Sequence, residues 1–181
     1  WAYRERLKNW GDCFARGIHM VNGNEDSTIQ VSYGYGLFTG GLGAHYGGEA
    51  AGCTVIPTSS GNTKRQIQMM KDLGTDILAC TPSYALLIAD TAIEMGYDPA
   101  VDFKISAGIF GAEPASESMR EDIRKKLGIQ YCDVYGLSEV MGGGGHGVRG
   151  VARPACGGGS FYAEIVDPDT LKPLPDASTA S

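Results

Sequence analysis

The sequence has no apolar run long enough to span a bilayer, no CxxC cysteine pair and no excess of basic residues. A membrane-spanning helix needs about 20 apolar residues, and the first twenty residues are too charged for a secretory signal peptide. Fifteen Lys and Arg against 21 Asp and Glu give a net charge of −6, which argues against nucleic acid or an anionic membrane as a partner. These absences predict a cytoplasmic protein with neither kind of partner.

The five cysteines stand far apart, which favours reduced thiols over a disulfide framework or a zinc ribbon. Cys53, Cys80 and Cys132 lie inside apolar runs and are expected in the core. The three histidines also lack the spacing of metal ligands. We expect them to be structural or solvent-facing, with His45 the strongest exception because it follows an aromatic segment.

Glycine is abundant, at 27 of 181 residues, and it falls in clusters instead of a fixed period, which excludes a collagen-like chain. Hydrophobic residues make up 43% of the sequence, enough for a core of ordinary size. The chain is therefore expected to fold as one domain, or as part of a larger one.

Apolar periodicity predicts strands that alternate with helices. Strands are expected at residues 28–32, 53–57, 76–80, 105–110, 129–134 and 161–166, and helices at residues 1–19, in the glycine-rich stretch to about 51, and at 63–73, 81–96 and 116–127. Thr63, Thr81 and Ser116 are the expected N-caps, and Gly74 and Gly128 the expected ends. This alternation predicts an α/β fold, a mainly parallel sheet flanked by helices, with ligands beyond the carboxyl ends of the strands.

Three segments have the residue types of a nucleotide or aryl-ligand site. Residues 135–139 combine an aromatic ring, a glycine, a hydroxyl and a carboxylate. Residues 111–114 put small residues at a strand end, and residues 33–41 interleave Tyr33, Tyr35 and Phe38 with four glycines, as in a slot for a planar apolar ligand. By pattern alone, the same segments also fit a polar loop, a helix-capping turn and a close-packed core. No P-loop, GxGxxG fingerprint or Ser-His-Asp order is convincing.

Read together, these segments resemble the phenylacetate-coenzyme A ligase family of adenylate-forming enzymes. The matching stretches are YGYGLFTGGLGAHYG (33–47), Pro57 with SGNT (60–63), CTPSY (80–84), IFGAEP (109–114) and YGLSEVM (135–141). The resemblance covers residues 1–141 and resumes at 161–176. Residues 1–176 are thus interpreted as part of an AMP-binding domain, the large N-terminal domain of such an enzyme, and residues 177–181 as a truncated tail.

The resemblance implies a two-step reaction, in which ATP activates a carboxylate as an acyl-adenylate and the thiol of coenzyme A then displaces AMP. It assigns the adenine side to Gly111, Ala112, Glu113 and Pro114, and the rest of the nucleotide pocket to Tyr135, Gly136 and Leu137, with Asp133 nearby. Ser138 would contact phosphate and Glu139 would bind Mg²⁺, both as catalytic residues. Tyr35, Phe38 and Gly41 would shape the pocket for the aryl acid. Related ligases suggest a homodimer for the full-length parent.

The family's phosphate loop is expected before residue 1, and its ribose-binding segment and C-terminal lid beyond Ser181. The 181 residues are therefore expected to lack ligase activity alone. Two alternatives remain open: a non-catalytic module that binds nucleotide or aryl acid, and a ligase for another aryl acid such as coumarate or anthranilate.

Residues 142–160 depart from the family sequence and are rich in glycine, with His146 and Cys156 among them. A one-base shift in the codons of residues 154–160 permits Leu-His-Val-Glu-Glu-Asp-His, close to the family's Leu-His-x-Trp-Glu-Asp-His. We hypothesise a compensated frameshift in this segment, which would make His146 and Cys156 accidental, and we expect the glycine run to be flexible. Sequencing of the coding DNA tests this hypothesis.

Overall fold

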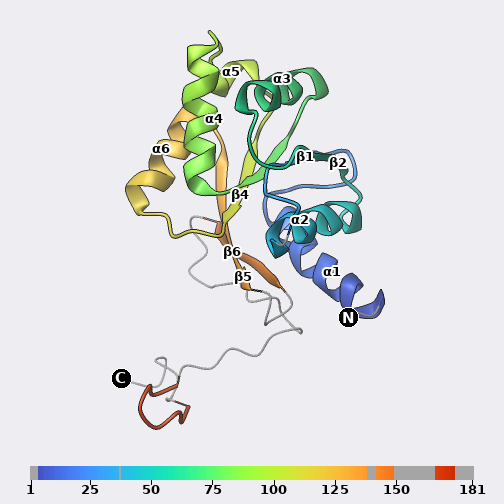
Figure 1. Ribbon diagram of the computed structural model, residues 1–181, viewed down its shortest axis with the longest axis vertical. Coiled ribbons are helices and arrows are strands. Elements are labelled where there is room, and N and C mark those ends of the chain that lie inside the picture. The colour runs from blue at the N-terminus through green and yellow to red at the C-terminus, as the bar shows by residue number, and fades with distance from the viewer. Residues whose placement is uncertain (1–3, 37, 138–141, 149–165, 174–181) are drawn as a thin grey trace.

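The computed structural model describes residues 4–36, 38–137, 142–148 and 166–173 (Figure 1). Their elements, in chain order, are α1 (Arg4–Met20), β1 (Thr28–Val31), α2 (Thr39–Ala50), β2 (Thr54–Pro57), α3 (Thr63–Leu73), β3 (Ile77–Cys80), α4 (Pro82–Glu94), α5 (Pro99–Asp102), β4 (Ala107–Gly111), α6 (Glu117–Leu127), β5 (Gln130–Leu137) and β6 (Gly142–Val148). The predicted α/β class and the alternation of strands and helices are confirmed.

The strands of the described ranges form one sheet in the order β2-β1-β3-β4-β5-β6. Each pair from β2 to β5 is parallel, whereas β6 runs antiparallel to β5. The sheet is thus mainly parallel, as predicted, and the carboxyl ends of β1 to β4 lie at one edge.

Helices cover both faces of the sheet, so the fold has three layers. Figure 1 shows α4 and α6 on one side of β4, and α1 with α2 on the other side. The strand residues alternate between two cores, as the pleat requires: Ile77 and Ala79 pack with α1 and α2, whereas Leu78 and Cys80 pack with α3, α4 and α6. Cys13, Cys53, Cys80 and Cys132 are buried and free, as expected for reduced core thiols.

Most helix boundaries follow the predicted caps. The Thr81 hydroxyl accepts from the Tyr84 amide and the Ser116 hydroxyl from the Met119 amide, while Gly74 and Gly128 end α3 and α6 in the left-handed conformation. The expected cap at Thr63 is wrong, because Thr63 is the first helical residue of α3. The N-cap is Asn62, at φ 49°, and its side chain makes no capping bond.

The structure differs from the sequence prediction at the end of β5. Residues 135–137, expected in a loop, continue β5, because residues 142–144 pair with them through the backbone. Part of the glycine run forms a strand, β6 (Gly142–Val148), because a ladder needs only main-chain donors and acceptors. The flexibility expected for the glycine run stays a prediction. The expected strand at 161–165 lies outside the described residues, while Val166 forms an isolated bridge with Pro173 around the predicted turn.

Glycines allow α1 and α2 to pack closely. A Cβ at Gly47 would lie 2.5 Å from the Phe14 Cβ, and one at Gly43 would lie 3.0 Å from the Trp10 indole nitrogen. From the other side, a Cβ at Gly11 would lie 3.1 Å from the Tyr46 carbonyl oxygen. Side chains at these positions would push the two helices apart.

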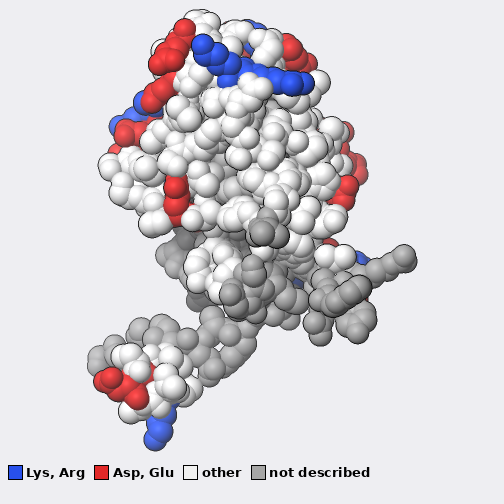
Figure 2. Space-filling model, in the orientation of Figure 1, with Lys and Arg blue, Asp and Glu red and all other residues white. Residues whose placement is uncertain are grey.

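Charges of both signs are interspersed on the surface. Figure 2 shows Lys and Arg beside Asp and Glu at the upper end of one face, and few charges over its centre. Over the residues that the structure describes, no helix has the length and apolar character needed to cross a bilayer.

We expect Gly47→Val to lower the free energy of unfolding by about 2 kcal/mol, because overpacking at the Phe14 contact separates α1 from α2. Gly36→Ala is the control, since a Cβ there has no atom within 4 Å and should change stability by less than about 0.5 kcal/mol. Urea unfolding followed by circular dichroism measures both. Equal stabilities for the two variants would contradict the close packing.

Candidate functional site

The strand order reverses next to β1. The chain passes from β1 to its neighbour β2, and then crosses back to β3 on the other side of β1. In open parallel sheets, the segments that follow two such strands diverge and leave a crevice at their carboxyl ends. Here the diverging segments begin with Ser32 after β1 and Thr81 after β3.

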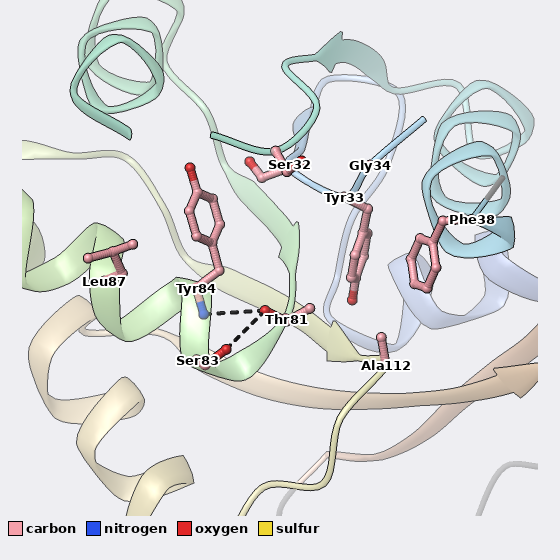
Figure 3. Close-up of a pocket in the computed structure, with 10 residues that line it drawn as sticks. Ser32, Tyr33, Gly34, Phe38, Thr81, Ser83, Tyr84, Leu87 and Ala112 are labelled. Atoms are coloured by element: carbon pink, nitrogen blue, oxygen red, sulfur yellow. Dashed lines mark hydrogen bonds between the residues drawn. The ribbon is translucent and has the colours of Figure 1, made fainter. Parts of the chain in front are cut away.

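A hollow of about 470 Å³ lies at this position. It is lined by Ser32, Tyr33, Gly34, Phe38, Ser60, Thr81, Ser83, Tyr84, Leu87 and Ala112. Figure 3 shows the rings of Tyr33 and Phe38 on one side, with Ala112 below them in this view, and Tyr84 and Leu87 of α4 on the other side. Its size suits a small aromatic ligand.

The aromatic wall is rigid on its inner side. Tyr33 is buried, and its hydroxyl reaches past β3 to donate to the Ile109 carbonyl of β4 at 3.3 Å. Burial raises the pKa of the Tyr33 hydroxyl well above its usual value, so this group stays a neutral donor. The Phe38 ring lies 5.8 Å from the Tyr33 ring at 39° and is 42% exposed, so it can rest on a ligand.

The opposite wall carries hydroxyl groups at the start of α4. Thr81 caps the helix, and its hydroxyl lies 3.3 Å from that of Ser83. The Ser83 amide donates to the Glu113 carboxylate at 2.5 Å. Glu113, expected on the adenine side, thus joins the end of β4 to the first turn of α4, where a negative charge is favourable.

Ala112 lines the hollow directly after β4. Its φ of 71° is in the left-handed region, which costs a residue with a Cβ about 1–2 kcal/mol. Gly111 precedes it, opposite Val134, and a Cβ on Gly111 would lie 2.4 Å from the Val134 carbonyl oxygen. The sheet therefore brings the segments after β4 and within β5 side by side, as the sequence predicted.

Two residues expected in the aryl pocket, Tyr35 and Gly41, are not among the residues that line the hollow. The Tyr35 hydroxyl is 3.1 Å from Nδ1 of His45, whose Nε2 is 3.4 Å from the Glu49 carboxylate. Burial raises the pKa of Tyr35 to about 12, and the charge of Glu49 adds to this. A Cβ at Gly41 would lie 2.4 Å from the carbonyl oxygen of Gly34, so Gly41 lets α2 approach a pocket-lining residue. Phe38 alone of the three expected residues lines the hollow.

The residues expected around the nucleotide lie on β5 and just beyond it. Tyr135, Gly136 and Leu137 are exposed, with Tyr135 at 63%. The Asp133 carboxylate forms an ion pair with Arg120 of α6 at 3.0 Å. Ser138 and Glu139 lie outside the described residues. Within the described ranges, no group of three His, Cys, Asp or Glu residues could hold a metal ion.

Sequence reasoning missed several residues of this site. Tyr33 was considered as part of the aromatic segment, but Tyr35 was assigned to the aryl pocket instead. A sequence in which aromatic residues alternate with glycines does not show which ring faces the ligand. It also missed Gln66, which is 2% exposed and contacts Ser32 of the pocket wall. The available signal was a glutamine beside Ile67 on the apolar stripe of a predicted helix.

Comparisons with known proteins agree with this fold. A family model described as AMP-binding enzyme matches residues 19–179. The chain is 47% identical over 172 residues to phenylacetate-coenzyme A ligase of Pseudomonas putida, and 44% identical over 173 residues to that of Escherichia coli K12. Each match covers 94% of this chain and 39% of the relative, so the chain spans about two fifths of their length.

Solved structures show the same fold at low sequence identity. A 2-hydroxyisobutyryl-CoA ligase in complex with 2-HIB-AMP and CoA matches with a TM-score of 0.71 at 22% identity, over 75% of this chain and 33% of that one. Apo MatB from Rhodopseudomonas palustris matches with a TM-score of 0.72 at 17% identity, over 94% and 33%. The resemblance noted from the sequence is thereby confirmed, and the chain belongs to the AMP-binding enzyme family.

Proposed function

We propose that this chain forms the acyl pocket and part of the nucleotide site of an ATP-dependent phenylacetate-coenzyme A ligase. The observation that carries the proposal is the hollow at the strand-order reversal, with its aromatic wall and the strained tip of β4. The similarity to curated phenylacetate-coenzyme A ligases supports the choice of acid.

In the first step, a carboxylate oxygen of the aryl acid would attack the α-phosphorus of ATP, and pyrophosphate would leave. In the second, the sulfur of coenzyme A would attack the acyl carbon of the mixed anhydride, lose its proton, and release AMP. Tyr33 and Phe38 would hold the aryl ring, which places the carboxylate toward Ala112 and the segment after β4. Fixing the ring in this way orients the carboxylate, and orientation of the reactants removes a large part of the barrier to a bimolecular reaction.

The nucleotide would lie along the adjoining strand ends. The backbone of residues 111–114 would face the flat adenine, and the exposed ring of Tyr135, on the neighbouring strand β5, would stack on the adenine. Ser138 stays our proposed phosphate contact and Glu139 our proposed ligand of Mg²⁺, an ion that offsets phosphate charge. A cytoplasmic location and a homodimeric parent also remain part of the proposal.

The anomalous segment at residues 142–160 is still proposed to arise from a compensated frameshift. The pairing of β6 with β5 uses backbone groups, so it fits either reading frame.

The chain is expected to bind phenylacetate saturably, and more tightly than cyclohexylacetate, because the hollow has aromatic walls. Phe38→Leu should weaken phenylacetate binding about fivefold to tenfold through loss of the ring contact. Isothermal titration of the 181-residue chain measures both effects.

The matched control is Tyr46→Leu, which removes another half-exposed aromatic ring, one that is not among the pocket-lining residues. It should leave the affinity within twofold. The titration panel includes 4-coumarate and anthranilate, and tighter binding of either would reassign the acid. Absence of saturable binding for every aryl acid would refute the acyl pocket.

Glu113→Ala should lower the free energy of unfolding by about 1 kcal/mol, since the Ser83 amide at the start of α4 loses its acceptor. It should also weaken AMP binding, because the segment at residues 111–114 is no longer joined to α4. Glu113→Gln keeps an oxygen acceptor and should recover most of both. Thermal unfolding and AMP titration test this, and equal behaviour of Ala and Gln would argue against a role for the acceptor.

A further inference from the structure

Gln66 has an unusual position for a polar side chain. It lies in the second turn of α3 and is 2% exposed. Its Nε2 donates to the carbonyl oxygens of Ser59 at 2.9 Å and Gly61 at 2.6 Å. Its Oε1 accepts from the Ser32 hydroxyl at 2.7 Å and lies 3.1 Å from the Thr58 hydroxyl. Both ends of the buried amide are therefore satisfied.

These partners belong to one wall of the hollow. Ser32 lines it from the end of β1, and Ser60 lines it from the loop between β2 and α3. Ser60 stands between the two residues whose carbonyl groups accept from Gln66. The amide thus holds Ser32 and the segment around Ser60 at a fixed separation.

The loop has an unusual backbone conformation, and a few other hydrogen bonds help to keep it in this shape. Ser59, Gly61 and Asn62 all have positive φ, at 61°, 83° and 49°, a conformation that is uncommon for a residue such as Ser59. The Ser59 amide donates to the Val31 carbonyl, and the Tyr84 hydroxyl donates to the Gly61 carbonyl at 3.3 Å. Strained backbone persists where its surroundings over-determine it, and the Gln66 bonds are the shortest of these contacts.

We propose that Gln66 is a positioning residue that fixes the Ser32–Ser60 wall of the hollow and so limits the size of the aryl group that enters. This inference rests on the proposed acyl function of the hollow. Both polar atoms of the Gln66 side chain are hydrogen-bonded within the protein, so Gln66 would act on a ligand only through the wall that it holds.

The test compares Gln66→Met, which keeps the length and burial of the side chain but none of its hydrogen bonds, with two controls. Gln68→Met makes the same change on the exposed face of α3. Ile67→Val weakens the adjacent core without touching the loop. The last variant separates a loss of stability from a loss of positioning.

The first readout is the ratio of affinities for phenylacetate and 4-tert-butylphenylacetate. Gln66→Met should bind phenylacetate about tenfold more weakly while retaining or gaining affinity for the bulky acid, because the wall relaxes outward. Both controls should keep the wild-type ratio within twofold, since general destabilisation lowers both affinities together. An unchanged ratio in Gln66→Met would overturn the inference.

The second readout needs no ligand. Amide hydrogen exchange across residues 58–62 should accelerate about tenfold in Gln66→Met and stay unchanged in Ile67→Val. If the wild-type chain binds neither acid, the proposed function fails and the exchange result alone decides whether Gln66 holds the wall. Should Gln66→Met fail to fold, Gln66→Glu keeps the acceptor and loses the two donated bonds, and its loop should also exchange faster. Wild-type exchange in that variant would refute the role of Gln66.

Discussion

The reversal of strand order next to β1 is the constraint on which the site depends. Because β2 and β3 flank β1, the chain leaves the ends of β1 and β3 in different directions, and neither α2 nor α4 covers the space between them. The walls of the hollow are a consequence of this reversal: Tyr33 follows β1, the Thr81 cap follows β3, and Ala112 follows β4. No side chain creates the crevice; the side chains determine what fits in it.

Glycines decide how closely the aromatic segment approaches this crevice. Gly43 and Gly47 let α2 pack closely against α1, and Gly41 lets the same helix approach the carbonyl of Gly34. From the sequence, aromatic slot and close-packed core were competing explanations of residues 33–41. The structure supports both, because Tyr33 is a core residue on one side and a pocket wall on the other.

Much of the fold could be predicted because its signals are local. Thr81 followed by Pro82, Ser116 three residues before Met119, and glycines after Leu73 and Leu127 define helix ends through groups a few residues apart. The extension of β5 could not be predicted, since it requires a partner strand made of glycines with no β-propensity of their own. Likewise, the choice of Tyr33 over Tyr35 depends on the Ile109 carbonyl, which is 76 residues away in the sequence.

The two halves of the proposed site differ in what stabilises them. The acyl half is surrounded by buried side chains, among them Tyr33 and Gln66. The nucleotide half depends on residues 135–137 of β5, whose partners in β6 are residues 142–144. Glycine costs about 0.5–1 kcal/mol of backbone entropy relative to alanine at each such position, and it adds no side-chain packing. Opening of β6 should therefore require less free energy than opening of the strands around the acyl pocket, because those strands are covered on both faces. Replacing the glycines of β6 by β-branched residues would therefore stabilise mainly the nucleotide half of the site. The acyl half would be affected only through the pairing of β4 with β5 at Gly111 and Val134.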